Sequence, residues 1–220
     1  MLELMVTMAQ YPVDYWRPYS QYTVSFAALG FLSFLATGVG TLSEYWVKYE
    51  YGNYNRTDLV QYEGVWRKCY YTSSIELTDS QCEIINYLEK PREGPGYAFY
   101  TRLYEIMLSA VIFMTLGTLT AFLSEVIAIL TIKFQKKSFI QCSGYFFILA
   151  GIFTLTGCVL FTVKVSMEDR WWPEETLGPV PEKSFNFHWA FFCAWGGAVS
   201  SFFIGGFYFK LSRLYIEGIF

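Results

Sequence analysis

Four long apolar stretches limit what this chain can fold into more than any other feature of its sequence. The hydrocarbon core of a bilayer is about 30 Å thick, and roughly 20 apolar residues in helical form cross it. The stretches that meet this length are residues 23–42, 106–132, 139–163 and 187–209. Charged residues make up only 16% of the 220 residues, against about a quarter in soluble domains. We therefore expect an α-helical membrane protein with four transmembrane helices in a single domain, residues 1–220.

Basic residues beside these stretches predict how the chain is oriented. The connection between the second and third stretches holds three lysines and no acid, and basic residues also follow the fourth stretch. These residues are Lys133, Lys136, Lys137, Lys210 and Arg213. Short loops rich in lysine and arginine remain in the cytoplasm. We therefore expect a multi-pass plasma-membrane protein with both termini in the cytoplasm and two extracellular segments, residues 44–105 and 164–186.

The larger extracellular segment contains a sequence that accepts N-linked glycans. Asn55-Arg56-Thr57 matches the Asn-x-Ser/Thr pattern, which occurs once in the chain. Its position agrees with the extracellular location that the basic residues predict. Asn55 is therefore the candidate glycosylation site.

The same segment has the pattern of a small β-sheet. Residues 45–51 alternate large apolar and charged side chains and end at a turn signal. A second run, residues 59–72, is rich in Val, Tyr and Trp, and residues 78–80 predict a turn before residues 82–85. Because so long a connection without structure would be unusual, we expect the segment to form a compact β domain.

Two of the five cysteines, Cys69 and Cys82, lie in this segment, and the other three lie within apolar stretches. A disulfide between Cys69 and Cys82 would cross-link neighbouring strands, and a loop of this length contributes about 3 kcal/mol to stability. Extracellular proteins fold under oxidising conditions, so we expect the disulfide in preference to the alternative, two free thiols.

These residues resemble the signature of the claudin and PMP22 superfamily. That signature is a Trp after the first span, then Gly-Leu-Trp, two residues and a Cys, and a second Cys further along. Here it reads Trp46, Gly64-Val65-Trp66-Arg67-Lys68-Cys69 and Cys82, with Val65 in place of the usual Leu and a slightly longer cysteine spacing. The resemblance implies a left-handed four-helix transmembrane bundle with a small extracellular antiparallel β-sheet that carries a disulfide.

Within the superfamily, the Gly-x-Trp-Arg-x-Cys form with an upstream glycosylation site is most similar to the voltage-dependent calcium channel gamma subunits and the AMPA-receptor regulatory proteins. This resemblance implies a non-enzymatic auxiliary subunit of an ion channel or ionotropic receptor. Such a subunit modulates gating or trafficking by contacting a larger pore-forming subunit through its spans and its sheet. Two alternatives stay open: a claudin-type protein of cell–cell adhesion or paracellular barriers, and a PMP22-like membrane scaffold.

Five residues are candidate contacts with such a partner. Gly197, Ser201 and Gly205 recur at every fourth position of the fourth stretch. This spacing allows helices to approach closely, either within the protein or against a partner. Trp171 and Trp172 lie among acids in the second extracellular segment. Adjacent tryptophans are typical both of the membrane interface and of hot spots in protein contacts.

Glu125 is the one acid deep within an apolar stretch. Carboxylates inside a membrane often serve a function. Because Lys133 follows two turns later, we favour a position near the cytoplasmic interface, and the alternative is a hydrogen-bonding role within the bundle.

The sequence offers no catalytic or metal-binding set of residues. His188 is the only histidine, and neither a Gly-rich phosphate loop nor a zinc-type spacing occurs. The net charge is −3 and no long basic run exists, so nucleic acid is not an expected partner. We therefore expect no enzyme activity, no cofactor and no small-molecule substrate. The expected partners are membrane lipids and a larger channel or receptor subunit.

Overall fold

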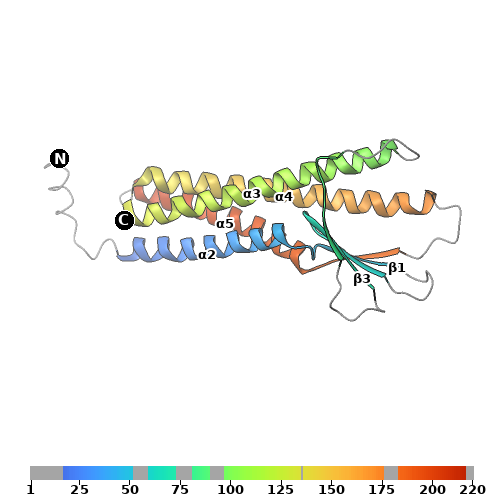
Figure 1. Ribbon diagram of the computed structural model, residues 1–220. Coiled ribbons are helices and arrows are strands. Elements are labelled where there is room, and N and C mark those ends of the chain that lie inside the picture. The colour runs from blue at the N-terminus through green and yellow to red at the C-terminus, as the bar shows by residue number, and fades with distance from the viewer. Residues whose placement is uncertain are drawn as a thin grey trace, which may run out of the picture.

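A bundle of four long helices makes up most of the molecule, and a small sheet lies at one end of it (Figure 1). The computed structural model describes residues 17–51, 59–72, 81–89, 97–134, 136–175 and 183–216. Its helices are α2 (Arg17–Leu42), α3 (Tyr97–Phe134), α4 (Lys137–Glu175) and α5 (Trp189–Ile216). Each of the four is long and apolar enough to cross a membrane, which confirms the four predicted spans among the described residues.

The helices form a closed ring, in which α2 and α4 each contact both α3 and α5. All four are apolar on nearly every side, as expected where some faces meet protein and others meet lipid. Small residues allow their backbones to approach. Gly117 of α3 lies against Thr154 of α4, and Gly144 of α4 lies against Gly205 of α5. Close packing of this kind is the main force that holds helices together in lipid.

The small residues of the fourth span pack inside the protein's own bundle. Gly197 lies against Thr37 of α2, and Ser201 forms a 3.0 Å hydrogen bond with Ser33 of the same helix. Gly205 lies against α4. Of the two roles open to Gly197, Ser201 and Gly205, the structure therefore supports internal packing.

The sheet has five antiparallel strands in the described residues, in the order β4-β3-β2-β1-β5. The strands are β1 (Val47–Tyr51), β2 (Leu59–Glu63), β3 (Arg67–Thr72), β4 (Gln81–Ile84) and β5 (Lys183–Phe187). β1 pairs with β2 on one side and with β5 on the other, so the two predicted extracellular segments join in one sheet. An antiparallel sheet beside a four-helix bundle is the fold that the sequence predicts.

Two details of the predicted sheet are wrong. The run 59–72 is not one strand, because the chain reverses between Glu63 and Arg67 and forms a second strand. At the reversal, a side chain on Gly64 would lie 2.2 Å from the carbonyl oxygen of Ser43, so only glycine fits. Residues 183–187 form a strand that the sequence pattern did not indicate. Phe187, predicted to open the fourth span, therefore belongs to the sheet.

Two helices also extend beyond the predicted spans. α3 begins at Tyr97 instead of residue 106, and α4 continues past residue 163 to Glu175. The second predicted extracellular segment is thus largely helical at its start. Apolar composition marks where a helix leaves the hydrocarbon, and just beyond that point α4 contacts the sheet. Lys164, for example, bonds both to the sheet and to Glu168 one turn along α4.

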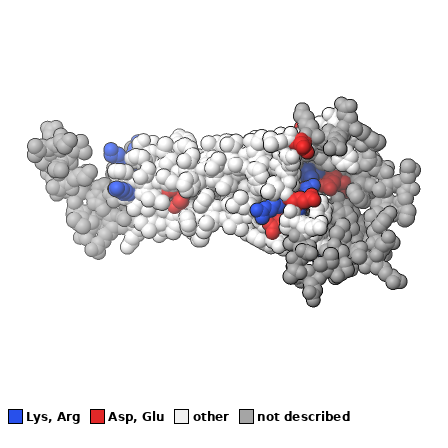
Figure 2. All heavy atoms as spheres, viewed as in Figure 1, with Lys and Arg blue, Asp and Glu red and all other residues white. Residues whose placement is uncertain are grey.

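Charged residues gather at the two ends of the molecule, with an almost uncharged band between them (Figure 2). The end away from the sheet is basic on the face shown, whereas the sheet end carries both signs. The start of α2, the α3–α4 connection and the end of α5 all lie at the basic end (Figure 1). This arrangement is that of a multi-pass membrane protein whose helices cross four times. The assignment of the basic end to the cytoplasm stays a prediction.

Gly205 and Gly206 give a matched test of the packing. A Cβ atom on Gly205 would lie 2.7 Å from Ile148 Cγ1 and 2.9 Å from the Gly144 oxygen, whereas one on Gly206 would meet nothing within 4 Å. We expect Gly205→Ala to lower the free energy of unfolding by about 1–3 kcal/mol through overpacking. Gly206→Ala should be neutral or slightly stabilising. Thermal unfolding in detergent measures both, and equal behaviour of the two variants would refute the assigned helix contacts.

Candidate functional site at the junction of sheet and helices

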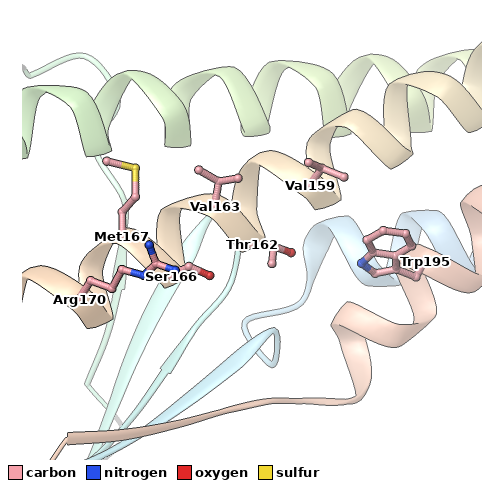
Figure 3. Close-up of a pocket in the computed structure, with 7 residues that line it drawn as sticks. All are labelled: Val159, Thr162, Val163, Ser166, Met167, Arg170 and Trp195. Carbon is pink, nitrogen blue, oxygen red and sulfur yellow. The ribbon is translucent and has the colours of Figure 1, made fainter.

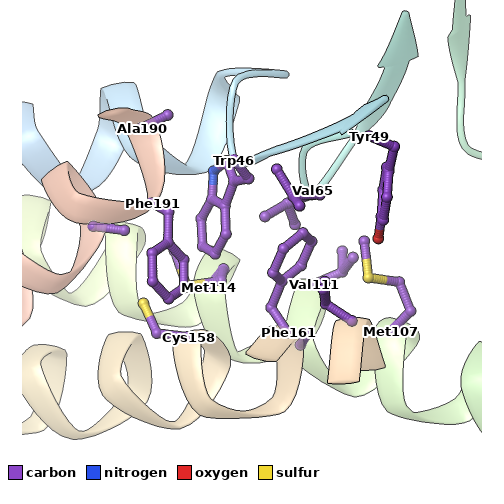
Figure 4. Close-up of a cluster of buried hydrophobic side chains, with 14 residues drawn as sticks. Trp46, Tyr49, Val65, Met107, Val111, Met114, Cys158, Phe161, Ala190 and Phe191 are labelled. Carbon is purple, nitrogen blue, oxygen red and sulfur yellow. The ribbon is translucent and has the colours of Figure 1, made fainter. Parts of the chain in front are cut away.

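Two residues of the sequence signature, Trp46 and Val65, meet where the sheet lies against the helices (Figure 4). Trp46 is fully buried, and its indole N–H donates a hydrogen bond to the carbonyl oxygen of Gly40 at the end of α2. Its ring lies between Phe161 of α4 and Phe191 of α5, with edge contacts to both. Edge-to-face pairs of this kind add about 0.5–1.5 kcal/mol each beyond burial. Trp46 thus fixes the start of β1 to three helices.

The turn between β2 and β3 is also packed against the helices. Val65 is fully buried in the same cluster as Trp46, so the smaller Val fills the place where the signature has Leu. The Gly64 N–H donates to the Arg67 carbonyl oxygen and closes the turn. Trp66 stands edge-on to the ring of Tyr87, which follows β4. The turn therefore links two strands to the bundle core.

Two tyrosine hydroxyls extend this connection to α3. Tyr87 donates to the carbonyl oxygen of Val65, and Tyr104 of α3 donates to the carbonyl oxygen of Tyr87. Burial, and after it the nearby Glu63 carboxylate, raise the pKa of Tyr87 well above its usual range. The phenol therefore stays protonated and remains a donor.

A buried ion pair joins the sheet to α4. Lys164 Nζ lies 2.9 Å from Glu63 Oε1 and 2.6 Å from Glu168 Oε2, and Lys68 Nζ lies 3.3 Å from Glu63 Oε1. Glu63 is 1% exposed. Tyr49 of β1 donates a longer hydrogen bond, 3.4 Å, to Glu168. Sequence reasoning missed this network, because its two central residues lie 101 positions apart and no local pattern connects them.

The predicted disulfide between Cys69 and Cys82 is present. It connects neighbouring strands, since Cys69 faces Cys82 across the β3–β4 pair and Tyr62 across the β2–β3 pair. Cross-strand partners share one face of a sheet, and Glu63 belongs to the opposite face. The disulfide therefore lies on the face turned away from the helices. It holds β4, the edge strand, whose four residues are all exposed.

The outward face of the sheet is polar and aromatic. Lys48 and Glu50 form an ion pair at 2.5 Å, and the hydrogen bond with Glu50 raises the pKa of Lys48. Tyr62 packs edge-on against Tyr45 and Tyr71. A hydrogen bond with Tyr71 and burial raise the pKa of Tyr45 to about 12. Rigid aromatic side chains beside a few charges are typical of surfaces that bind proteins.

His188 belongs to this aromatic group. Its ring centroid lies 5.7 Å from that of Tyr45 and 5.6 Å from that of Tyr62. The backbone N–H of His188 donates a hydrogen bond to the backbone carbonyl oxygen of Trp46, just before α5 begins. In the part of the chain that the structure describes, no three His, Cys, Asp or Glu residues gather in a way that could hold a metal ion.

Glu125 lies inside the bundle. It is 6% exposed and occupies space that Gly30 of α2 leaves free, beside Phe147 of α4. Among the described residues, its Oε2 atom has no hydrogen-bond partner. The side chain is thus enclosed by helices. Its position near the cytoplasmic interface stays a prediction.

Three predicted site residues lie outside what the structure describes. Asn55 belongs to an undescribed part of the chain, and the side chains of Trp171 and Trp172 are undescribed although α4 includes their backbone. Their roles stay predictions.

Comparison with known families agrees with this geometry. The family model described as PMP-22/EMP/MP20/Claudin tight junction matches residues 28–209, from within α2 to the last turns of α5. No individual curated protein matches the chain.

The Glu63–Lys164 pair can be tested by removing one partner and then both. Lys164→Met leaves the buried Glu63 carboxylate without its nearest cation, so we expect the free energy of unfolding to fall by about 3–5 kcal/mol. Adding Glu63→Gln should restore much of that loss. The control Lys48→Met removes an exposed pair and should cost at most about 1 kcal/mol. If Lys164→Met costs no more than Lys48→Met in thermal unfolding, the ion pair does not fix the sheet to α4.

Proposed function

This chain belongs to the PMP-22/EMP/MP20/claudin family, and on that basis we propose that it is a non-enzymatic auxiliary subunit of an ion channel or ionotropic receptor. It would act in the plasma membrane with both termini in the cytoplasm and the sheet outside. Within the family, Gly64-Val65-Trp66-Arg67-Lys68-Cys69 resembles the calcium channel gamma subunits and AMPA-receptor regulatory proteins most. Arg67, which distinguishes this form, is exposed at the start of β3, one of the two strands that the disulfide joins.

The observation that carries this proposal is the rigid attachment of the sheet to the helices. Trp46, Val65 and Glu63 are buried at the junction, and each contacts at least one helix or its end. A partner that touches the outward face of the sheet therefore acts on the bundle as well. If such a subunit binds one state of a channel better by about 1.4 kcal/mol, it shifts the equilibrium between the states tenfold.

The exposed face of α5 supports a contact within the membrane. Its outward residues recur every three or four positions and form one stripe: Phe192, Gly196, Val199, Phe203 and Gly206. At Gly196 and Gly206 an added Cβ would meet nothing within 4 Å. A partner helix can therefore approach the backbone closely at these two points. They take the role that the sequence suggested for Gly197 and Gly205, which face inward.

A second candidate function is adhesion between cells or a paracellular barrier. It is favoured by the exposed edge of β4, where Ile84 is 74% exposed. An uncovered edge strand can pair with the same strand of another copy. A PMP22-like scaffold is the third possibility within the family, and it requires neither contact.

Purification from native membranes in mild detergent separates these functions. An auxiliary subunit should bring down a pore-forming subunit in stoichiometric amount, identified by mass spectrometry. A barrier protein expressed alone should instead form strands and raise transepithelial resistance. The second result without the first would overturn the proposal.

The stripe on α5 makes a sharper prediction. Gly196→Leu should reduce the recovered pore-forming subunit several-fold, because it blocks close approach, while leaving the unfolding temperature unchanged. Leu119→Phe, on the exposed face of α3, adds volume elsewhere on the membrane surface and should change neither quantity. Equal recovery with Gly196→Leu and wild type would show that α5 is not the contact.

A further inference from the structure

A groove of about 440 Å³ runs between α4 and α5 near the sheet (Figure 3). Val159, Val163 and Met167 line it on α4, and Trp195 lines it on α5. The α4 residues are spaced by four, so they form one stripe along the helix. Its volume falls within the range of pockets that hold small ligands, about 300–1,000 Å³.

The groove changes character along its length. Val159 and Val163 belong to the apolar span predicted from the sequence, whereas Ser166 and Arg170 lie beyond its end at residue 163. Figure 3 shows the Arg170 guanidinium next to Ser166. Among the described residues that line the groove, Arg170 is the single charged one and none is an acid. An occupant should therefore be apolar at one end and anionic at the other.

A second polar group lies deeper in the groove. The indole N–H of Trp195 is shielded from solvent and has no hydrogen-bond partner among the described residues. In Figure 3 its nitrogen is on the side of the ring that faces Thr162. A buried donor without an acceptor costs about 1–3 kcal/mol. An occupant that supplies an oxygen at this level would remove that cost.

We propose that this groove binds one glycerophospholipid from the leaflet next to the sheet, with its phosphate at Arg170, an ester carbonyl at Trp195 and an acyl chain along Val163 and Val159. Arginine recognises phosphate through charge-assisted, often bidentate hydrogen bonds. Thr162 and Ser166 are one turn apart, about 6 Å along the helix axis. A phosphate beside Ser166 would thus leave the glycerol esters near the level of Thr162. This inference is independent of the proposed partner.

A transmembrane helix from a partner fits the groove less well. Its apolar side chains would leave the Trp195 donor unpaired and would offer nothing to Arg170. Among membrane components, a glycerophospholipid carries the anion, the carbonyl acceptors and the apolar chain in this order.

The test uses native mass spectrometry of the delipidated full-length chain with three added lipids of equal chain length. Ester-linked phosphatidylcholine has both polar features, its ether-linked analogue lacks the carbonyls, and diacylglycerol lacks the phosphate. We expect one retained phosphatidylcholine per chain. The ether analogue should bind about 3- to 10-fold more weakly, because it loses one neutral hydrogen bond. Diacylglycerol should bind more weakly by about 10-fold or more, because it loses the charged contact.

Two variants assign these contacts to residues. Trp195→Phe should weaken binding of the ester lipid to the level of the ether lipid. It should leave binding of the ether lipid unchanged, because loss of the carbonyl and loss of the indole N–H each remove the same hydrogen bond. Arg170→Gln should weaken phosphatidylcholine but not diacylglycerol. Trp189→Phe and Arg67→Gln, both outside the groove, should change nothing. Unfolding temperatures measured without lipid confirm that each variant is folded.

Three results would overturn the proposal. One is equal retention of all three lipids by the wild-type chain, which would indicate unspecific annular binding. Another is unchanged binding in Trp195→Phe and Arg170→Gln. The third is a dimer that Trp195→Phe dissociates, which would place a second copy of the chain in the groove.

Discussion

The buried contact between the sheet and the helices determines how the rest of the molecule is arranged. Glu63 is removed from water, which is costly for a carboxylate unless a cation is fixed beside it. Lys164 meets this need only because α4 continues past the membrane span and positions its side chain 2.9 Å from Glu63. Trp46 adds a hydrogen bond to the end of α2 and two ring contacts. These contacts fix the place of the sheet against α2, α4 and α5.

The sequence predicted those parts of the fold that depend on composition and local pattern. Runs of apolar residues located the four spans, and alternation located β1. The disulfide was predicted because Cys69 and Cys82 are the two cysteines that lie outside the apolar stretches. What it could not predict depends on contacts between distant residues. Residues 183–187 become β5 only because β1 offers them an unpaired edge. The first extra turn of α4 likewise meets the sheet through Lys164, which lies 101 positions from its partner Glu63.

The same limit applies to the candidate contact surfaces. A helix that is apolar on every side has no pattern that reveals its rotation, so the sequence alone could not separate Gly196 from Gly197 or Gly205 from Gly206. Neighbouring positions differ by about 100° around the helix axis. Packing against α2 and α4 decides which of each pair is buried, and Gly196 and Gly206 face away from the bundle. Glu125 likewise lies inside the bundle because Gly30 leaves room for its carboxyl group.

Function in this account depends on the sheet and the bundle moving as one body. The most direct measurement is the distance between two spin labels attached to introduced cysteines. One label is on Arg67→Cys, on the outward face of the sheet, and the other is on Leu119→Cys, on the exposed face of α3. The labels are attached after Cys142, Cys158 and Cys193, the free cysteines, are replaced by alanine. Pulsed electron paramagnetic resonance should give a single narrow distance distribution in nanodiscs. A broad or multiple distribution would show that the sheet moves independently and would contradict the central claim.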